Sequence, residues 1–138
     1  MPLRSRAREV ALQLLFQLDV NHTVPRKVIT RFVAERLGSA SGDPFCLALY
    51  DGVIANLKDI DKRLSAAAEN WRLPRMAIVD RNVLRMGVFE IAIMAEKTPP
   101  AVAMNEAIEL ARRYGSKDSP AFVNGVLDKI AKTAAAKA

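Results

Sequence analysis

Residues 80–95 read DRNVLRMGVFEIAIMA, and this run decides the fold that the sequence predicts. From residue 83 onward it has few polar positions, which is typical of a helix that is buried on nearly every side. Such a helix needs other helices around it, so we expect it at the centre of an all-α domain. Asp80 is expected to cap this helix or to lie at a bend that leads into it. The positions that carry the pattern are Val83, Leu84, Met86, Gly87, Val88, Phe89, Ile91 and Ile93.

Helical periodicity continues on both sides of this run, with Pro and Gly between the periodic segments. We find no alternation of apolar and polar residues long enough to predict a strand. The sequence therefore predicts six or seven helices in two small bundles that share the central helix. The other expected helices span residues 4–20, 25–37, 43–71, 98–115 and 119–131, and the Ala/Lys-rich tail at 132–138 is expected to fray.

The bulk composition predicts a single basic domain. The chain has 138 residues, of which 51% are hydrophobic, enough for one compact domain over 1–138. A formal net charge of +6 favours polyanionic partners, nucleic acid first and acidic membrane second, although the charge can also serve solubility alone. Cys46 lies between apolar residues and is interpreted as a core side chain. With His22 as the sole histidine, we expect no metal site and no cofactor.

Three classes of protein find no support in the sequence: membrane proteins, exported proteins and enzymes. The longest apolar-rich stretch, 86–95, contains Glu90 and is too short for a membrane span. The basic start resembles an export signal, but polar residues interrupt the run after it and no cleavage site follows. A single cysteine agrees with a reducing, cytoplasmic location. Because no Gly-rich phosphate loop, G-x-S-x-G or HExxH motif is present, we expect no enzyme activity.

Three arginines, Arg4, Arg6 and Arg8, stand at the start of the first expected helix. Cations at a helix N-terminus oppose the helix dipole, so stability alone would not favour them there. The planar guanidinium group matches phosphate, and three of them in a short arm can neutralise two or three phosphates. We interpret these residues as a phosphate-binding arm. The alternative is a solvated basic end of the helix.

A basic and aromatic turn, RRYGSKDSPAF at 112–122, joins the last two expected helices. Helix N-termini bind phosphate through free N–H groups, and aromatic rings beside cations are the usual platform for unpaired bases. Alternatively, the two rings only hold the helices together. Asp118 is a good cap and can also accept hydrogen bonds from base amino groups. If arm and turn form one solvent-facing groove, its RNA-binding residues are Arg4, Arg6, Arg8, Arg112, Arg113, Tyr114, Lys117, Asp118 and Phe122.

Leu12 and Phe16 form a second apolar face on the first expected helix. They lie one turn apart and point roughly opposite to the core stripe of that helix. Such a face indicates either a second packed neighbour within the domain or a docking patch for a partner, and the residues leave both open. A docking patch here would meet another protein or a second copy of the chain, as in a homodimer.

Three blocks match a known family: RSRAREVALQLLFQLDV at 4–20, DRNVLRMGVFEI at 80–91 and MNEAIELARRYGSKDSPAFVNGVLDK at 104–129. Together they resemble the NusB family of bacterial transcription antitermination factors over nearly the whole chain. The resemblance implies an all-α fold of two perpendicular three-helix bundles. It also implies binding to the single-stranded boxA element of nascent ribosomal RNA. This binding is joint with the ribosomal protein NusE, within the antitermination complex of RNA polymerase.

The resemblance also implies roles for individual residues. It places the partner-protein surface at Phe16 and Asp80, which supports a docking role for the face that Leu12 and Phe16 form. The chain departs from the family pattern at Pro120, which replaces a polar residue, and at Ser5 between the arginines, so RNA binding is expected to be weaker than usual. The RNA-binding positions that it implies are Arg4, Arg6, Arg8, Tyr114, Asp118 and Phe122.

Two other functions stay open at this point. The RNA-binding domain of a ribosomal-RNA methyltransferase resembles NusB as well. Because this chain ends at residue 138, we expect it to lack the catalytic domain of such an enzyme. A helical adaptor that binds only protein would share the apolar face but would show no affinity for RNA.

Overall fold

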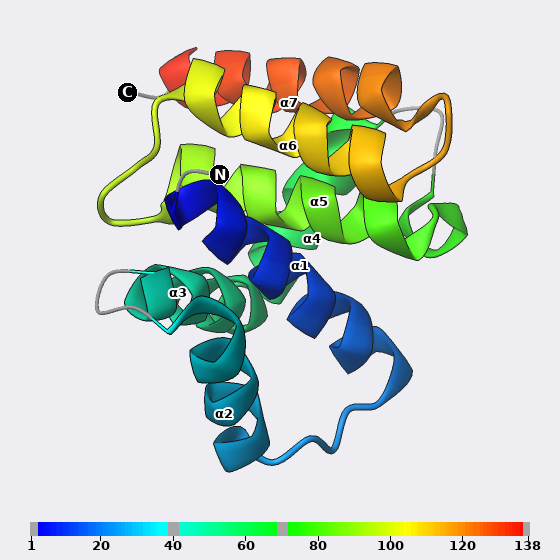
Figure 1. The fold of residues 1–138 in the computed structure, drawn as a ribbon. Coiled ribbons are helices and arrows are strands. Elements are labelled where there is room, and N and C mark those ends of the chain that lie inside the picture. The colour runs from blue at the N-terminus through cyan, green and yellow to red at the C-terminus, as the bar shows by residue number, and fades with distance from the viewer. Residues whose placement is uncertain (1–2, 39–41, 69–71, 137–138) are drawn as a thin grey trace.

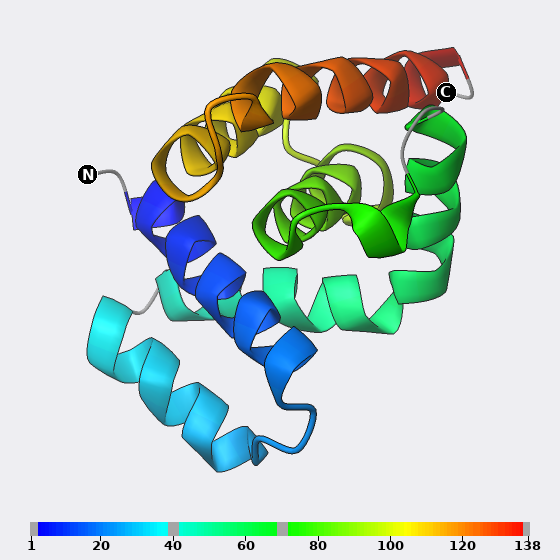
Figure 2. The ribbon, with the colours of Figure 1, turned by 90° about the vertical axis from the view of Figure 1, so that its right-hand side faces the viewer.

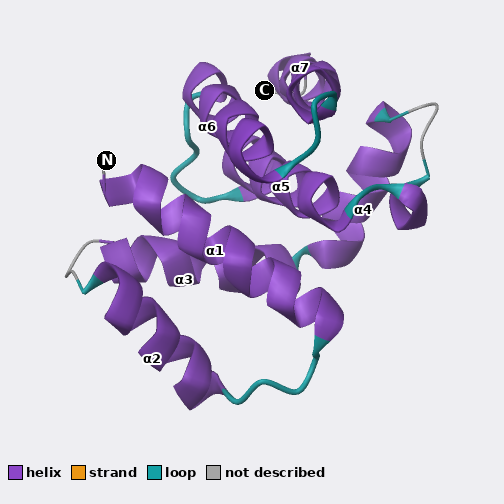
Figure 3. Cartoon of the chain, turned by 45° about the vertical axis from the view of Figure 1, so that its right-hand side comes forward, coloured by secondary structure: helices purple, strands orange, loops and turns teal. Residues whose placement is uncertain are grey.

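The structure is a computed structural model that describes residues 3–38, 42–68 and 72–136. Every secondary-structure element within these ranges is helical (Figure 3), which confirms the all-α prediction. The elements are α1 (Leu3–Val20), α2 (Arg26–Leu37), α3 (Gly42–Ala55), α4 (Leu57–Ala67), the 3₁₀ turn η1 (Leu73–Arg75), α5 (Ile78–Val88), the π-helical turn η2 (Phe89–Ile93), α6 (Pro100–Tyr114) and α7 (Ser119–Ala136).

The helices form two bundles (Figure 1). In the first bundle, α1, α2 and α3 pack against one another. In the second, α5, α6 and α7 pack together, and α4 lies against α5 and α7. Because α1 also packs against α5, it joins the bundles, and its N-terminal end lies beside the second bundle (Figure 2).

The central helix expected over 80–95 is formed by α5 and η2. Its side chains from position 82 to 91 are buried, with the exception of Arg85. The helix begins at Ile78, so Asp80 lies in its first turn and does not cap it. The cap position is held by Ala77, which makes no side-chain hydrogen bond, and the chain enters through η1. The expectation that Asp80 caps this helix or lies at a bend before it is therefore wrong, because the chain is already helical from Ile78.

The single helix expected over 43–71 is two helices in the structure, because the chain breaks at Asn56. The Asn56 Nδ2 donates a hydrogen bond to the carbonyl of Gly52 at 2.8 Å. Asparagine competes in this way with the backbone bonds that would continue a helix. After the break, α4 packs against α5 and α7 and ends at Ala67. The expected end near Trp71 lies outside the described residues. The tail that was expected to fray is helical over 132–136, where it continues α7, and residues 137–138 lie outside the described ranges.

Asp19, near the end of α1, ties the first bundle to α5. Its Oδ2 accepts hydrogen bonds from Asn82 Nδ2 at 2.9 Å and from an Arg81 NH2 at 3.2 Å. Burial raises the pKa of this carboxyl, but the two hydrogen bonds and the charges of Arg81 and Arg85 lower it by more. The pKa of Asp19 therefore lies below its ordinary value of 3.8.

We expect Asp19→Asn to lower the free energy of unfolding at neutral pH by about 1 kcal/mol, since an amide is a weaker acceptor for Arg81. A carboxyl whose pKa is lowered by folding stabilises the fold above its unfolded pKa and loses this contribution as the pH falls. In urea unfolding, the difference between wild type and variant should therefore close once the pH drops below 3.8. A difference that persists at strongly acid pH would contradict the prediction.

Candidate nucleic-acid interface

Two arginines of the expected arm, Arg4 and Arg6, reach the surface in the first turns of α1. The guanidinium carbon of Arg4 lies 4.5 Å from the ring centre of Phe45 in α3. The Arg6 side chain is 44% exposed, and its NH1 donates to Glu9 Oε2 at 2.9 Å. Both guanidinium groups are accessible to a phosphate, and each is oriented by a neighbouring side chain.

The third arginine, Arg8, is not on the surface, and its expected place in the arm is wrong: the residue is 3% exposed. Its Nε and NH2 donate to the carboxylate of Glu90 at 2.7–3.1 Å, and Thr98 Oγ1 donates to the same carboxylate at 2.8 Å. Glu90 lies in η2 within the core, where a carboxylate without a partner is strongly destabilising. Arg8 therefore balances a buried charge. The sequence holds a signal for this, because Glu90 is the one acid within 83–93.

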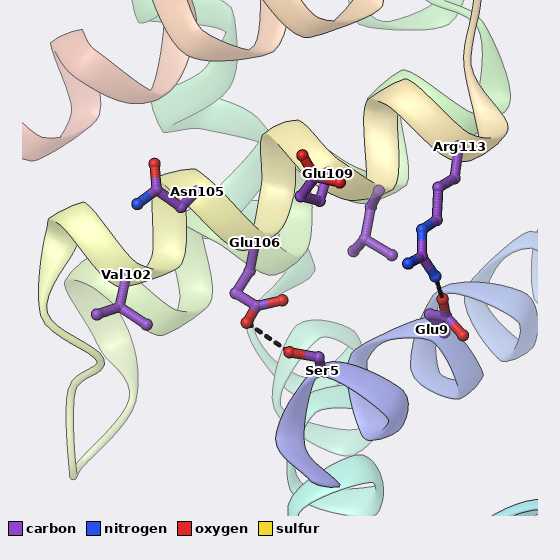
Figure 4. Close-up of a pocket in the computed structure, with 8 residues that line it drawn as sticks. Ser5, Glu9, Val102, Asn105, Glu106, Glu109 and Arg113 are labelled. Carbon is purple, nitrogen blue, oxygen red and sulfur yellow. Dashed lines mark hydrogen bonds and ion pairs between the residues drawn. The ribbon is translucent and has the colours of Figure 1, made fainter. Parts of the chain in front are cut away.

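A row of polar contacts, the α1–α6 seam, joins the arm to α6 (Figure 4). Ser5 Oγ donates to Glu106 Oε1 at 2.6 Å, and Glu9 forms an ion pair with Arg113 near the end of α6. The Glu9 side chain is 5% exposed and pairs with both Arg6 and Arg113. A groove of about 340 Å³ lies between the two helices, and its lining includes Ser5, Glu9, Glu106 and Arg113. The arm and the basic and aromatic turn therefore lie side by side.

The backbone of the turn between α6 and α7 is tightly packed. A Cβ atom at Gly115 would lie 2.5 Å from Ser119 Oγ and 2.7 Å from the carbonyl oxygen of Ala111, so glycine is required there. The hydroxyl of the buried Ser119 accepts a hydrogen bond from the Ser116 N–H at 2.9 Å. These contacts fix the path of the chain between the two helices.

The turn presents cations and a ring to the solvent. Tyr114 is 42% exposed at the end of α6. Arg112 forms an ion pair with Glu109 on the same helix, and both side chains are more than half exposed. The exposed residues that the sequence predicted here are Arg112, Arg113, Tyr114, Lys117 and Asp118.

Phe122 lies beside a pocket of about 280 Å³ between the turn and the start of α5, which we call the Phe122 pocket. The partly buried ring packs against the core and also lines the pocket. Asp118 lines the same pocket and stands at the cap position of α7, where its carbonyl accepts the Phe122 N–H at 3.2 Å. Asp80 lines the pocket from α5, and among the described residues its Oδ1 is buried without a hydrogen-bond partner. Sequence reasoning missed other lining residues, among them Arg75 and Met76.

The two residues of the apolar face on α1 differ in exposure. Leu12 is 4% exposed and belongs to the core, whereas Phe16 is 41% exposed. The expectation that Leu12 forms part of a surface patch is wrong, because α1 packs against α2, α3 and α5 and is covered on more than one side. Of these two residues, Phe16 alone is exposed to solvent.

Within the described ranges, Cys46 is a core side chain, as the sequence predicted. Nowhere in these ranges do three or more His, Cys, Asp or Glu side chains gather in a way that could hold a metal ion. Cys46 is fully buried, and this burial, with the charges of Asp43 and Asp51, raises the pKa of its thiol to about 12. Such a thiol is unreactive at neutral pH. None of the helices described is both long and apolar enough to cross a membrane.

Comparison with known proteins identifies the family. Residues 5–132 match the NusB family. The chain belongs to the NusB family. The transcription antitermination protein NusB of Sorangium cellulosum (strain So ce56) is 46% identical over 132 residues, which cover 96% of this chain and 94% of that protein. Membership confirms that the chain is a transcription antitermination protein and not an enzyme.

Solved NusB structures have the same fold. The structure of T. maritima NusB matches with a TM-score of 0.82 and 35% identity, and the match covers 96% of this chain and 92% of that one. A structure of the antitermination factors NusB and NusE in complex with double-stranded RNA contains a chain that matches with a TM-score of 0.84 and 26% identity. That match covers 96% of this chain and 98% of the other. The all-α, NusB-like fold is thereby confirmed.

Proposed function

We propose that this NusB-family protein binds the single-stranded boxA element of nascent ribosomal RNA together with NusE, within the antitermination complex of RNA polymerase. The observation that carries the proposal is the α1–α6 seam. There, Glu9 pairs with Arg6 of the arm and with Arg113 of the turn, so that cations from the two segments share one surface. The neighbouring structure in which NusB and NusE bind RNA supports the same class of partners.

The exposed cations supply affinity that does not depend on RNA sequence, because they contact phosphates. Three of them pair with Glu9 or Glu109 through NH1 of an exposed guanidinium group, and a phosphate oxygen can accept hydrogen bonds from the other N–H groups of the same guanidinium. Arg8 is left out of this set because it is buried. The proposed phosphate contacts are Arg4, Arg6, Arg112, Arg113 and Lys117.

The rings and Asp118 supply the preference for unpaired bases. Tyr114 and Phe122 offer ring faces for stacking, and the carboxylate of Asp118 accepts hydrogen bonds from base amino groups. Base faces and edges are accessible in a single strand but not in a stacked duplex. The neighbouring complex contains double-stranded RNA, so the strand preference must be measured for this protein.

The contact with NusE is proposed at Phe16 and Asp80. Phe16 is 41% exposed, and a large apolar side chain of this kind anchors protein interfaces. The alternative occupant of Phe16 is a second copy of this chain. Sedimentation of the protein with and without NusE distinguishes a homodimer from a heterodimer. Phe16→Asp should weaken the dimer that is observed.

The salt dependence of RNA binding tests the proposed function. If the exposed cations neutralise about three to five phosphates, a plot of log Kobs against log salt concentration should have a slope of about −2 to −3.5. We would titrate a short single-stranded boxA-type RNA by fluorescence anisotropy at several salt concentrations, with and without NusE. A flat salt response would refute the electrostatic part, and equal binding of the same sequence as a duplex would refute the preference for unpaired bases.

A further inference from the structure

A second basic groove, with a volume of about 600 Å³, lies between α4 and α7. Lys62 and Arg63 line this α4–α7 groove from α4, and Lys129 and Lys132 line it from α7. An adjoining groove shares Arg63 and adds Lys97 from the segment before α6. None of these residues belongs to the α1–α6 seam or to the Phe122 pocket.

Cations outnumber acids in the α4–α7 groove. Of the residues that the structure describes in its lining, one is an acid, Asp59, which pairs with Arg63 at 3.0 Å. Asp61, on the same helix, forms an ion pair with Arg85 of α5 at 2.9 Å and does not pair with the described cations of the groove. Lys132 pairs with Asp128 at 2.8 Å, but the Lys132 side chain is 77% exposed and can turn to another anion. Lys62 forms no ion pair with any of the described residues, so the groove keeps a positive charge.

The floor of the groove suits a nucleic-acid backbone better than a protein partner. Between the cations, the lining consists of small side chains together with Ile130. Among the described residues, the lining includes no aromatic ring and no large exposed apolar side chain, which are the residues that anchor protein interfaces. A strand of phosphates needs only cations at intervals and room to approach. The small lining residues are Ala66, Ala67, Thr133 and Ala134.

We infer that the α4–α7 groove binds the phosphate backbone of RNA that continues beyond the Phe122 pocket. This inference extends the proposed function. Helix α7 begins at Ser119, next to the pocket, and Lys129 and Lys132 lie about 15–20 Å further along at 1.5 Å per residue. RNA that leaves the pocket therefore follows a single helix to reach the groove (Figure 2). The groove adds affinity to longer RNA without adding sequence preference.

The test compares a short boxA-type RNA with the same RNA extended by an unstructured single-stranded tail. The wild type should bind the extended RNA more tightly, whereas Lys62→Gln/Lys132→Gln should lose this gain and bind the short RNA as before. Losing two phosphate contacts should also make the salt slope for the extended RNA shallower by about 1.4. Glutamine preserves helix propensity, so we expect both variants and wild type to have the same circular dichroism.

Lys27→Gln/Lys58→Gln is the matched control, because it removes the same charge from exposed residues that do not line the groove. An equal loss in this control, or no loss in Lys62→Gln/Lys132→Gln, would overturn the inference. The inference would also be overturned if the groove binds polyglutamate while the RNA tail has no effect on affinity. That result would indicate an acidic protein partner. If the wild type fails to bind the short RNA, the proposed function fails. In that case, the inference about the groove is tested by measuring how tightly the same two variants bind a homopolymeric single-stranded RNA.

Discussion

Arg8→Met should lower the free energy of unfolding by about 3–5 kcal/mol, because it leaves the carboxylate of Glu90 buried without its charged partner. The Arg8 guanidinium makes hydrogen bonds of 2.7–3.1 Å to that carboxylate. It also lies 3.6 Å from Glu106 of α6. The interactions that are lost therefore lie where α1, η2 and α6 pack together. Urea unfolding followed by circular dichroism measures it, and RNA affinity per folded molecule should stay unchanged.

Two further variants make this prediction specific. Arg4→Met removes an arginine from the exposed end of the same helix and should cost about 0.5–1 kcal/mol, the value of its contact with the Phe45 ring. Arg8→Met/Glu90→Leu removes both buried charges and should recover most of the lost stability. If Arg8→Met folds normally but loses RNA binding, Arg8 belongs to the interface after all.

Phe122→Ala should weaken binding of a short single-stranded RNA by about 1–3 kcal/mol, or about 5- to 150-fold, through the loss of one stacking surface. The ring lines the Phe122 pocket together with Asp118 and Asp80. Part of the ring packs against the core, so truncation also lowers stability. RNA affinity must therefore be expressed per folded molecule, with the folded fraction taken from thermal unfolding.

Phe16→Ala is the matched control for Phe122→Ala. It makes the same change at a ring that is 41% exposed on α1 and does not line the Phe122 pocket. We expect it to leave the binding of RNA alone unchanged and to weaken only the binding of the partner protein. Phe122→Leu keeps most of the packing but removes the aromatic face, and it should lose affinity as Phe122→Ala does. Equal RNA affinity for all three variants would assign Phe122 to the core.

The fold could be predicted because its signals are local. Apolar residues at helical spacing, with Pro and Gly between the segments, located the helices, and the apolar run at 83–93 located the central one. The break between α3 and α4 was missed although it also has a local cause. Asn56 bonds the backbone of Gly52 within one turn, and a polar residue amid a long apolar period can indicate such a break.

The site could be predicted only in part, because burial depends on contacts between distant segments. The partner of Arg8 is 82 positions away in sequence, and the partner of Arg113 is 104 positions away. Periodicity on α1 cannot show that three helices cover it, and this is why Leu12 is in the core. The exposed turn was easier to predict, since short polar segments between helices lie on the surface.

The pairing of Glu9 with two arginines affects how much side-chain entropy is lost when RNA binds. An arginine side chain that is fixed on binding loses up to about 2 kcal/mol of rotamer entropy. Because Glu9 already restricts Arg6 and Arg113, much of this loss occurs during folding, and an incoming phosphate binds guanidinium groups that are already oriented. We expect such a preorganised surface to bind RNA more tightly than the same arginines would if they rotated freely.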